Sequence, residues 1–281
     1  MTDRASWHLQ PGDAVAGGRR VVRQLGGGKR TEVVLARGED PSDLVVVKLL
    51  RPSATGVAAR ALLAEGELLG RLDHPLFPRL LELREDRGAL QLVLEHVPGP
   101  RLSTAVRRTG PLGAADAARL VLELADGLAS LHRAGAVHLD VKPSNTILSS
   151  RSRLLDLGVA RSLADAAAVR GLVGSHRFQS PEQHDPASFG GLSPATDVWG
   201  VGVTVATALR GSSPFGPLRD ERDVRRRLAP DDVRRLELPA EVPAVLERLV
   251  RDAMAWEPAA RPAMPELVDR ARAVDDELSG E

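Results

Sequence analysis

The residue types that could do chemistry gather in the segment HLDVKPSNTIL, residues 138–148, where Asp140, Lys142 and Asn145 lie close together. Asn145 is the only asparagine of the 281-residue chain, and Lys142 is one of three lysines, although lysine and arginine together number 38. A carboxylate can accept the proton of a hydroxyl group, a compact ammonium can contact phosphate, and an amide oxygen can bind a metal ion. Each residue alone would be interpreted as a turn residue or a helix cap, but the set indicates phosphate chemistry.

A further carboxylate lies downstream in the sequence LLDLG, where we expect Asp156 to follow an apolar strand and precede a glycine. Mg²⁺ prefers one or two protein carboxylates together with phosphate oxygens. On its own, Asp156 would be an ordinary turn aspartate. Together with the amide of Asn145, it indicates a magnesium site.

The second of the three lysines, Lys48, lies in the apolar run VVVKLL, which predicts a strand buried on both faces. A buried cation is costly unless a partner balances its charge. The helix expected after this strand carries Glu65 and Glu67, and either carboxylate could be that partner. The alternative is a lysine at a strand end whose ammonium reaches water.

Three consecutive glycines, Gly26, Gly27 and Gly28, lie between two strand-like runs in LGGGKRTEVVL. Glycine lets backbone N–H groups approach phosphate oxygens closely, but an ordinary hairpin turn would use glycine equally well. Strand on both sides argues against a Rossmann unit or a Walker loop, because both lead into a helix.

The elements that must position these residues change in character near Pro100. Before it, β-branched runs separated by turn residues predict strands, with one helical pattern among them, and after it helical patterns dominate. The expected strands cover residues 19–25, 32–38, 43–50 and 89–97, and the clearest helices cover residues 56–72 and 114–135. A strand-rich part joined to a helix-rich part predicts an α+β fold with two lobes and a cleft between them.

Composition argues against several classes of function. The formal net charge is zero, so the chain lacks the basic excess of nucleic-acid-binding proteins, and we expect no nucleic-acid partner. Without cysteine there is no disulfide, thiolate zinc site or cysteine nucleophile. The first residues lack the apolar core of a secretion signal, and the longest apolar run, residues 198–209, is too short to span a membrane and predicts a buried helix. We therefore expect a cytoplasmic protein with no membrane span.

Taken in order, these motifs resemble the catalytic domain of protein kinases, specifically the bacterial Ser/Thr kinases that are similar to eukaryotic ones. The resemblance implies a bilobal α+β fold, with a small β-rich N-lobe that carries one regulatory helix and a larger helical C-lobe. It covers about residues 17–272 within a single domain, residues 1–281, with the N-lobe at about 17–95, a hinge at about 95–101 and the C-lobe at about 102–272.

The resemblance also implies roles for individual residues. Lys48 is similar to the family's strand lysine, and counting back from the LDHP motif makes Glu65, rather than Glu67, its ion-pair partner. Asp140 resembles the catalytic base, and Lys142 resembles the lysine on the transferred phosphate, with Asn145 and Asp156 as Mg²⁺ ligands. The residues that would contact ATP are Gly26, Gly28 and Val33 of the glycine-rich loop, Val46 at the adenine roof, Leu94 at the gatekeeper position, Glu95 and Val97 of the hinge, and Ile147 beneath the ring.

Three further positions resemble structural residues of protein kinases. The segment SPE, which contains Glu182, is similar to the family's A-P-E segment, and Arg261 matches the arginine that pairs with its glutamate. Asp197, in DVWGVG, resembles a residue of the central helix of the large lobe. Small-molecule phosphotransferases of the same fold usually lack this substrate-binding segment, so these positions favour a protein kinase.

Leu139 departs from the family pattern, because it replaces an arginine that binds phosphate on the activation loop. Between Gly158 and Ser180 the sequence has no threonine or tyrosine, and its only hydroxyl side chains are Ser162 and Ser175. Ser175 matches a threonine that contacts the catalytic aspartate, which indicates a structural role. Our hypothesis is that activity does not depend on activation-loop phosphorylation. The other departures are Thr31 for the third loop glycine, Val46 for alanine and Leu157 for phenylalanine.

The predicted function is therefore transfer of the γ-phosphoryl group of ATP, with Mg²⁺, to a Ser or Thr hydroxyl of a protein substrate. The main alternative is an ATP-binding pseudokinase that acts as a regulator or scaffold, an idea that Leu139 and Val46 support. A small-molecule kinase is a second alternative. A separate regulatory partner is compatible with the sequence, which shows no sensor segment of its own.

Overall fold

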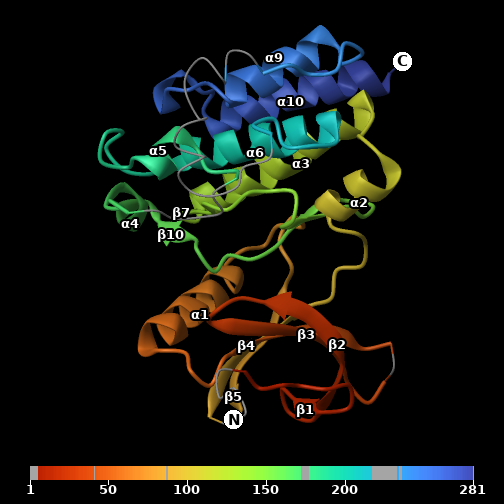
Figure 1. Cartoon of the computed structure of the whole chain (residues 1–281), viewed down its shortest axis with the longest axis vertical. Helices are drawn as coiled ribbons and strands as arrows, with labels where there is room; N and C mark the ends of the chain where they lie inside the picture. Colours follow the sequence, from red (N-terminus) through yellow and green to blue (C-terminus); the bar gives the residue numbers. More distant parts are fainter. Residues whose placement is uncertain are drawn as a thin grey trace. The chain divides into compact units, whose positions relative to one another are not determined.

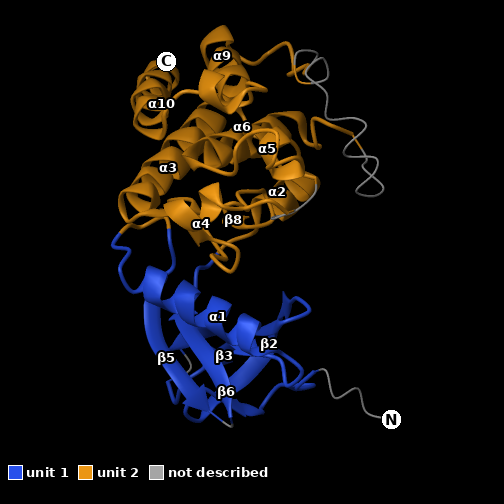
Figure 2. Cartoon of the chain, turned by 90° about the vertical axis from the view of Figure 1, so that its left-hand side faces the viewer, with its two compact units in different colours: residues 1–73, 77–98 blue, residues 74–76, 99–281 orange. Residues whose placement is uncertain are grey.

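The computed structural model describes residues 6–40, 42–86, 88–171, 177–216, 233 and 236–280. These residues form two compact units, which Figure 2 colours separately. Unit 1 contains the described residues up to Asp73 together with Phe77–Pro98, and unit 2 contains His74–Leu76 and the described residues from Gly99 onward. Among the helices of these ranges, none is long and apolar enough to cross a membrane.

Unit 1 is built on a six-stranded antiparallel sheet with the strand order β1-β2-β3-β4-β6-β5 (Figure 1). One helix, α1, lies between β4 and β5 in the chain and packs against β4, β5 and β6. The elements are β1 (Ala14–Val15), β2 (Arg19–Gly27), β3 (Thr31–Arg37), β4 (Leu44–Leu50), α1 (Gly56–Leu69), β5 (Leu80–Asp86) and β6 (Ala89–Glu95).

The two faces of this sheet differ because side chains alternate along each strand. In β4, Val45, Val47 and Leu49 belong to a buried apolar cluster with residues of β2, β3 and β6. Val46 and Lys48 lie on the opposite face, where α1 supplies the partner of the lysine. The sheet therefore buries one face in the core of unit 1 and directs Lys48 to the other.

The strands expected from the sequence are present, with ends that differ by a few residues, and α1 ends at Leu69 rather than at residue 72. No sequence pattern indicated β1 or β5. Both are edge strands. β1 is too short for a periodic pattern, and charged residues interrupt the apolar positions of β5, which is only partly buried.

Unit 2 is mainly helical. The helix α6 is buried at every position from 196 to 209, which confirms the expected buried helix at residues 198–209. It begins after Ser193, whose hydroxyl accepts a hydrogen bond from Ala195 N–H, and it ends at Gly211 in the left-handed conformation. The helices are α2 (Leu102–Thr109), α3 (Ala114–Arg133), α4 (Leu163–Ala167), α5 (Pro181–His184), α6 (Pro194–Arg210), α9 (Ala244–Ala253), η1 (Pro258–Ala260) and α10 (Met264–Ser279).

Two short antiparallel strand pairs hold the loops of unit 2. One pair joins β7 (Ala136–Val137) to β10 (Arg161–Ser162), and the other joins β8 (Thr146–Ile147) to β9 (Arg153–Leu154). The apolar strand expected before Asp156 corresponds to β9. The other three strands are not among the expected elements, because two-residue strands leave no periodic pattern in a sequence.

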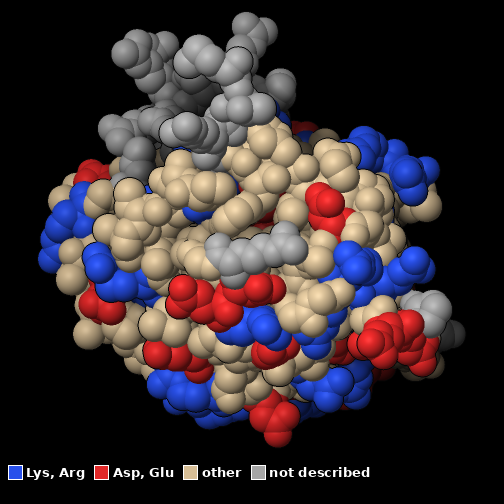
Figure 3. All heavy atoms as spheres, turned by 90° about the horizontal axis from the view of Figure 1, so that it is seen from below, with Lys and Arg blue, Asp and Glu red and all other residues tan. Residues whose placement is uncertain are grey.

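The surface carries charges of both signs. Figure 3 shows basic and acidic side chains interspersed on the face that it draws. This distribution agrees with the equal totals of 38 basic and 38 acidic residues.

Candidate active site

Five residues singled out in the sequence lie together on one face of the unit 1 sheet. The strand register pairs Gly26 with Val33, Val33 with Lys48, and Val46 with Leu94. Cross-strand partners share a face, and Val46 and Lys48 share it because they are two residues apart in β4. The face therefore presents an apolar surface beside an ammonium group, which suits a ligand with a flat ring and an anionic part.

Lys48 is paired with Glu65. Its Nζ donates to Glu65 Oε2 at 2.7 Å and to Oε1 at 2.9 Å, and both residues are buried. Glu67 is exposed, because residues two positions apart in a helix point in different directions. The carboxylate balances the buried cation and holds the ammonium at the sheet face.

The glycines occupy the β2–β3 hairpin, where Gly26 and Gly27 have φ angles of 142° and 148° that favour glycine. A Cβ atom on Gly27 would lie 2.6 Å from the carbonyl oxygen of Thr31, whereas one on Gly28 would meet no atom within 4 Å. The hairpin itself therefore requires Gly27. The space around Gly28 remains open to a ligand.

The end of β6 carries the next candidate residues. Glu95 N–H donates to the carbonyl of Arg79 at 3.0 Å, and Glu95 Oε2 accepts from Arg79 N–H at 3.1 Å. Val97 is buried, and residues 96–98 lie in no helix or strand. The backbone after Glu95 is thus released from the sheet ladder, while the Val97 side chain stays buried.

In unit 2, a buried carboxylate of α6 holds the loop that carries Asp140. Asp197 accepts hydrogen bonds from His138 N–H and Leu139 N–H, each at 2.8 Å, and lies 2.8 Å from His132 Nε2. Burial opposes ionisation of the Asp197 carboxyl, but the contact with His132 and the backbone donor outweigh it and lower its pKa. Leu139 has a φ of 65°, an unfavourable conformation for leucine that these bonds maintain.

Asp140, Lys142 and Asn145 form one hydrogen-bonded cluster. Lys142 Nζ donates to Asp140 Oδ2 at 2.6 Å, and Asn145 Nδ2 donates to the same oxygen at 3.1 Å and to the Asp140 carbonyl at 3.0 Å. The Asn145 side chain is buried, and its amide nitrogen is engaged by Asp140. Its amide oxygen is therefore the atom available to bind a metal ion.

The β8–β9 pair brings Asn145 and Asp156 together. Leu155 N–H donates to the carbonyl of Asn145 at 2.8 Å, and Asp156 follows directly with a φ of 68° and an exposed side chain. An amide oxygen and a carboxylate are hard oxygen ligands, so this pair fits Mg²⁺. Within the ranges that the structure describes, no group of three histidine, aspartate or glutamate side chains offers an all-protein metal site.

Ile147 lies in β8 and is buried. It forms an isolated bridge with Arg101, and the N–H of Leu148 donates to the Pro100 carbonyl at 3.0 Å. Gly99, with a φ of 125°, lies so close to the Leu148 carbonyl that a Cβ atom would clash. The segment that enters unit 2 is therefore fixed next to Ile147.

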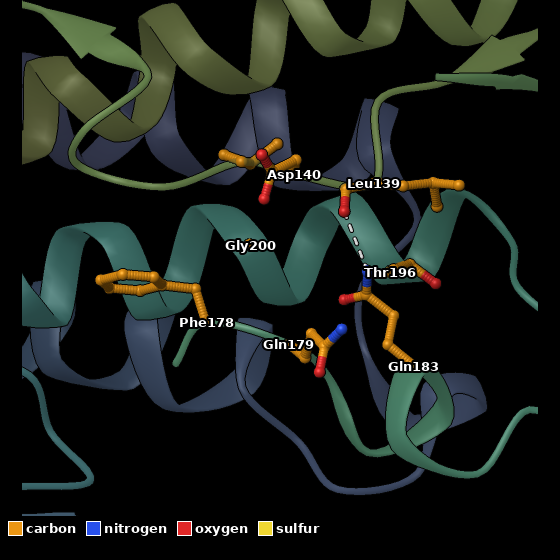
Figure 4. Close-up of a pocket in the computed structure, with 8 residues that line it drawn as sticks. Leu139, Asp140, Phe178, Gln179, Gln183, Thr196 and Gly200 are labelled. Carbon is orange, nitrogen blue, oxygen red and sulfur yellow. Dashed lines mark hydrogen bonds between the residues drawn. The ribbon is translucent and has the colours of Figure 1, made fainter. Parts of the chain in front are cut away.

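A small pocket lies beside Asp140 (Figure 4). Gln183 Nε2 donates to the carbonyl of Leu139 at 2.8 Å, which ties α5 to the loop. Gly200 allows α6 to approach the loop at Val141, because a Cβ atom on Gly200 would lie only 2.7 Å from Val141 Cβ. The pocket is lined by Leu139, Asp140, Val141, Phe178, Gln179, Gln183, Thr196 and Gly200. It leaves a small space beside Asp140, whose carboxylate can accept a hydroxyl proton.

Glu182 and Arg261 form a buried ion pair with two hydrogen bonds. Arg261 Nη1 donates to Glu182 Oε1 at 2.6 Å and Nη2 donates to Oε2 at 2.9 Å. The guanidinium also lies 5.1 Å from the ring centroid of Trp199. Its remaining donors bind the carbonyls of Ala195, Ala255 and Trp256. The pair joins α5, which carries Gln183, to the segment after η1.

Leu139 packs into an apolar cluster in place of the arginine that the resemblance would imply. It is 2% exposed and contacts a cluster that contains Val137, Ala166 of α4 and Leu192. The N–H of Leu192 donates to the Ala166 carbonyl at 3.0 Å. The segment after Asp156 is thus attached to the loop by apolar packing and by the β7–β10 pair.

Ser162 caps the helix α4. Its hydroxyl accepts from Asp165 N–H at 3.1 Å and donates to Asp165 Oδ2 at 2.8 Å. The side chain is exposed. Ser175, the other hydroxyl residue expected in this segment, lies outside the described residues.

A family model described as "Protein kinase domain" matches residues 19–271. The chain belongs to the protein kinase domain family. The fold class expected from the sequence, a β-rich N-lobe and a helical C-lobe, is confirmed by this match together with the six-stranded sheet of unit 1 and the helices of unit 2.

Relatives of this kinase domain include bacterial proteins. It is 33% identical over 265 residues to the probable serine/threonine-protein kinase PkwA of Thermomonospora curvata, covering 92% of the chain and 35% of PkwA. It is 33% identical over 221 residues to the serine/threonine-protein kinase PkaA of Streptomyces coelicolor, covering 75% of the chain and 40% of PkaA. It is 32% identical over 282 residues to PkaB of the same organism, covering 94% of the chain and 65% of PkaB. The chain therefore spans only part of the length of these relatives.

Sequence reasoning missed two residues that position the site of this kinase domain. Gln183 bonds to the Leu139 carbonyl, and His132 contacts Asp197. Gln183 directly follows Glu182, which is the only signal that the sequence offered for it. Nothing in the spacing of His132 indicates its partner.

Proposed function

We propose that this kinase domain transfers the γ-phosphoryl group of ATP to a serine or threonine hydroxyl of a protein. The observation that carries the proposal is the hydrogen-bonded set of Asp140, Lys142 and Asn145, with Asp156 joined to it through the β8–β9 pair. The names of the relatives, which are serine/threonine-protein kinases, support it.

The proposed contacts with ATP are those that the resemblance to protein kinases implies. Lys48, oriented by Glu65, contacts the phosphates, and the hairpin with Gly26 and Gly28 covers them. The ring of adenine packs on apolar side chains, and its edge bonds to the backbone after β6. The residues that serve the ring are Val33, Val46, Leu94, Glu95, Val97 and Ile147.

Asn145 and Asp156 are the proposed ligands of Mg²⁺. The metal ion, when bound, supplies positive charge that offsets the charge developing on the phosphate oxygens. Asp140 holds Asn145 through the amide nitrogen, so the amide oxygen is already oriented for this task. Asp156 contributes a carboxylate whose side chain is exposed.

Asp140 orients the substrate hydroxyl and accepts its proton as the oxygen attacks the γ-phosphorus, while the bond from the γ-phosphorus to the β–γ bridging oxygen breaks and ADP leaves. Lys142, 2.6 Å from the same carboxylate, neutralises the transferred phosphoryl group. Positioning and charge stabilisation supply most of the acceleration in such a reaction, because the protein performs little covalent chemistry.

Residues 1–281 would act as one catalytic domain, with the N-lobe at about 17–95, the hinge at about 95–101 and the C-lobe at about 102–272. Glu182, Asp197 and Arg261 serve as its structural residues. The contacts of Asp197 with the Asp140 loop and the Glu182–Arg261 pair support these roles.

The proposal includes activity that does not depend on phosphorylation of the activation segment. Leu139 stands in place of the arginine that binds the activation-loop phosphate in related kinases. Its apolar contacts with Ala166 and Leu192 support a segment that holds its position without an added charge. Ser162 caps α4 and is the exposed hydroxyl of the described part of this segment.

The test of the main proposal is phosphate transfer from radiolabelled Mg-ATP to a generic Ser/Thr protein substrate. The native chain should transfer phosphate, and Asp140→Asn should lower the rate by about 10²–10⁴-fold, as expected for loss of a general base. Asp13→Asn, on the surface of unit 1, is the matched control and should leave the rate unchanged. No transfer by the native chain, with ATP still raising its Tm, would identify a nucleotide-binding protein without kinase activity.

Independence from activation-segment phosphorylation is tested with Ser162→Ala and with phosphatase-treated native protein. Both should retain the native kcat, because neither alters the apolar contacts of Leu139. A large gain in rate after phosphorylation of Ser162 would overturn this part of the proposal and leave the main one intact.

A further inference from the structure

Residues 6–9 form a short segment that precedes the family match, which starts at residue 19. We call these residues the N-terminal clasp. Trp7 and Leu9 of the clasp pack on the apolar cluster of the unit 1 sheet, on the face opposite Lys48. The clasp is therefore part of the folded unit, although it lies outside the residues that the family model matches.

Trp7 is bonded to the ends of two strands. Its N–H donates to Glu32 Oε1 at 2.8 Å in β3, and its indole Nε1–H donates to the carbonyl of Leu50 at 2.7 Å at the end of β4. Ser6 Oγ donates to the same Glu32 oxygen at 2.9 Å. Leu50 lies two residues after Lys48, so the clasp contacts β4 close to the lysine of the candidate site.

Glu32 connects the clasp to the glycine hairpin. Its carboxylate is 1% exposed and lies 3.6 Å from Arg51 Nη1. Arg51 Nε in turn donates to the carbonyl of Gly28 at 2.8 Å, and Glu32 is the register partner of Gly27. A buried carboxylate requires such partners, and here they run without a break from Ser6 and Trp7 to the hairpin backbone.

We propose that the N-terminal clasp is a positioning element for the glycine hairpin. Ser6 and Trp7 fix the Glu32 carboxylate, Glu32 orients Arg51, and Arg51 holds the carbonyl of Gly28. The inference rests on the proposed function, in which this hairpin contacts the phosphates of ATP.

A hairpin that is fixed before the nucleotide arrives loses less conformational entropy on binding. Loosening the clasp should therefore weaken ATP binding more than it slows the transfer step. This separates the clasp from a contribution to stability alone, which would lower the Tm without changing the affinity for ATP.

The test uses the full chain and two conservative variants. Trp7→Phe keeps most of the apolar packing but removes the Nε1–H donor to Leu50, and Glu32→Gln keeps the size of the side chain but removes the charge that faces Arg51. Val15→Ala is the matched control, because Val15 lies in β1 and is buried in the same apolar cluster. Hydrogen exchange of the amides of residues 26–31 is measured without nucleotide, and KM for ATP and kcat are measured separately.

Both clasp variants should speed exchange in residues 26–31, Trp7→Phe by several-fold for the loss of one neutral hydrogen bond and Glu32→Gln by about ten-fold for the loss of the charge that faces Arg51. KM for ATP should rise several-fold with kcat nearly unchanged, and Val15→Ala should lower the Tm without either effect. The proposed role of the clasp would be overturned if both clasp variants left the exchange rate of residues 26–31 unchanged, or if Val15→Ala raised that rate equally. Failure of the native chain to bind ATP would instead contradict the proposed function, since the exchange measurement needs no nucleotide.

Discussion

Replacing Arg261 by methionine removes one half of a fully buried ion pair. The side chains of Arg261 and Glu182 are 0% and 1% exposed, so solvent screens neither charge. Methionine fills much of the volume of the arginine stem but leaves the Glu182 carboxylate without its two guanidinium bonds. Three backbone carbonyls also lose their donor.

The expected cost is about 3–5 kcal/mol in the free energy of unfolding, the usual result of leaving one partner of a buried pair uncompensated. For a domain of this size, each kcal/mol lowers the Tm by about 2–4 °C, so Arg261→Met should lower it by about 6–20 °C. Calorimetry and urea unfolding of the native chain and the variant measure this difference.

The matched control is Arg272→Met, which breaks an exposed pair with Asp269 whose atoms are 3.8 Å apart. It should change the free energy of unfolding by less than about 1 kcal/mol. The double variant Glu182→Leu with Arg261→Met should lose less stability than the sum of the two single variants, because no buried charge is left alone. A loss below about 1 kcal/mol for Arg261→Met, or strict additivity in the double variant, would refute the reasoning.

Three further predictions concern single residues. Gly27→Ala should cost about 1–3 kcal/mol in urea unfolding, because φ is positive and the new Cβ meets Thr31, whereas Gly28→Ala should cost far less; equal effects would contradict the steric argument. Folding lowers the pKa of Asp197 from its ordinary value of 3.8. At a pH above 3.8 the ionised carboxylate therefore stabilises the native state, and this stabilisation is lost as the pH falls through the lower folded pKa. Asp197→Asn should therefore flatten the acid decline of Tm below about pH 4, and an unaltered decline would show that other groups control it. Leu139→Arg should cost about 3 kcal/mol or more in urea unfolding, because it places an unpaired charge in the apolar cluster. An unchanged free energy of unfolding would show that the new guanidinium reaches water instead.

The local chemistry of the candidate site could be read from the sequence. Asp140, Lys142 and Asn145 lie within one short loop, so their spacing brings them together whatever the rest of the chain does. The abundance of arginine and the absence of any other asparagine made Lys142 and Asn145 stand out. The strands of unit 1 were predictable for the same reason, since alternation and turn residues are properties of neighbouring positions.

Contacts between residues far apart in the sequence could not be predicted from local patterns. Composition and spacing left Glu65 and Glu67 as equal partners for Lys48, and only a resemblance to kinases distinguished them or paired Glu182 with Arg261. The choice depends on the rotation of α1 against β4, which is set by packing rather than by any local pattern.

Other contacts had no sequence signal at all. The bonds of Trp7 to Glu32 and of Gln183 to Leu139 join residues 25 and 44 positions apart. Hydrogen bonds of this kind depend on distance and direction, and both are fixed only when whole elements pack together. The chemical groups, the main strands and helices and the loop that holds Asp140 all follow from local sequence. Which charges are paired, where Leu139 packs and what holds the glycine hairpin depend on tertiary packing, because those contacts form only between surfaces that folding brings together.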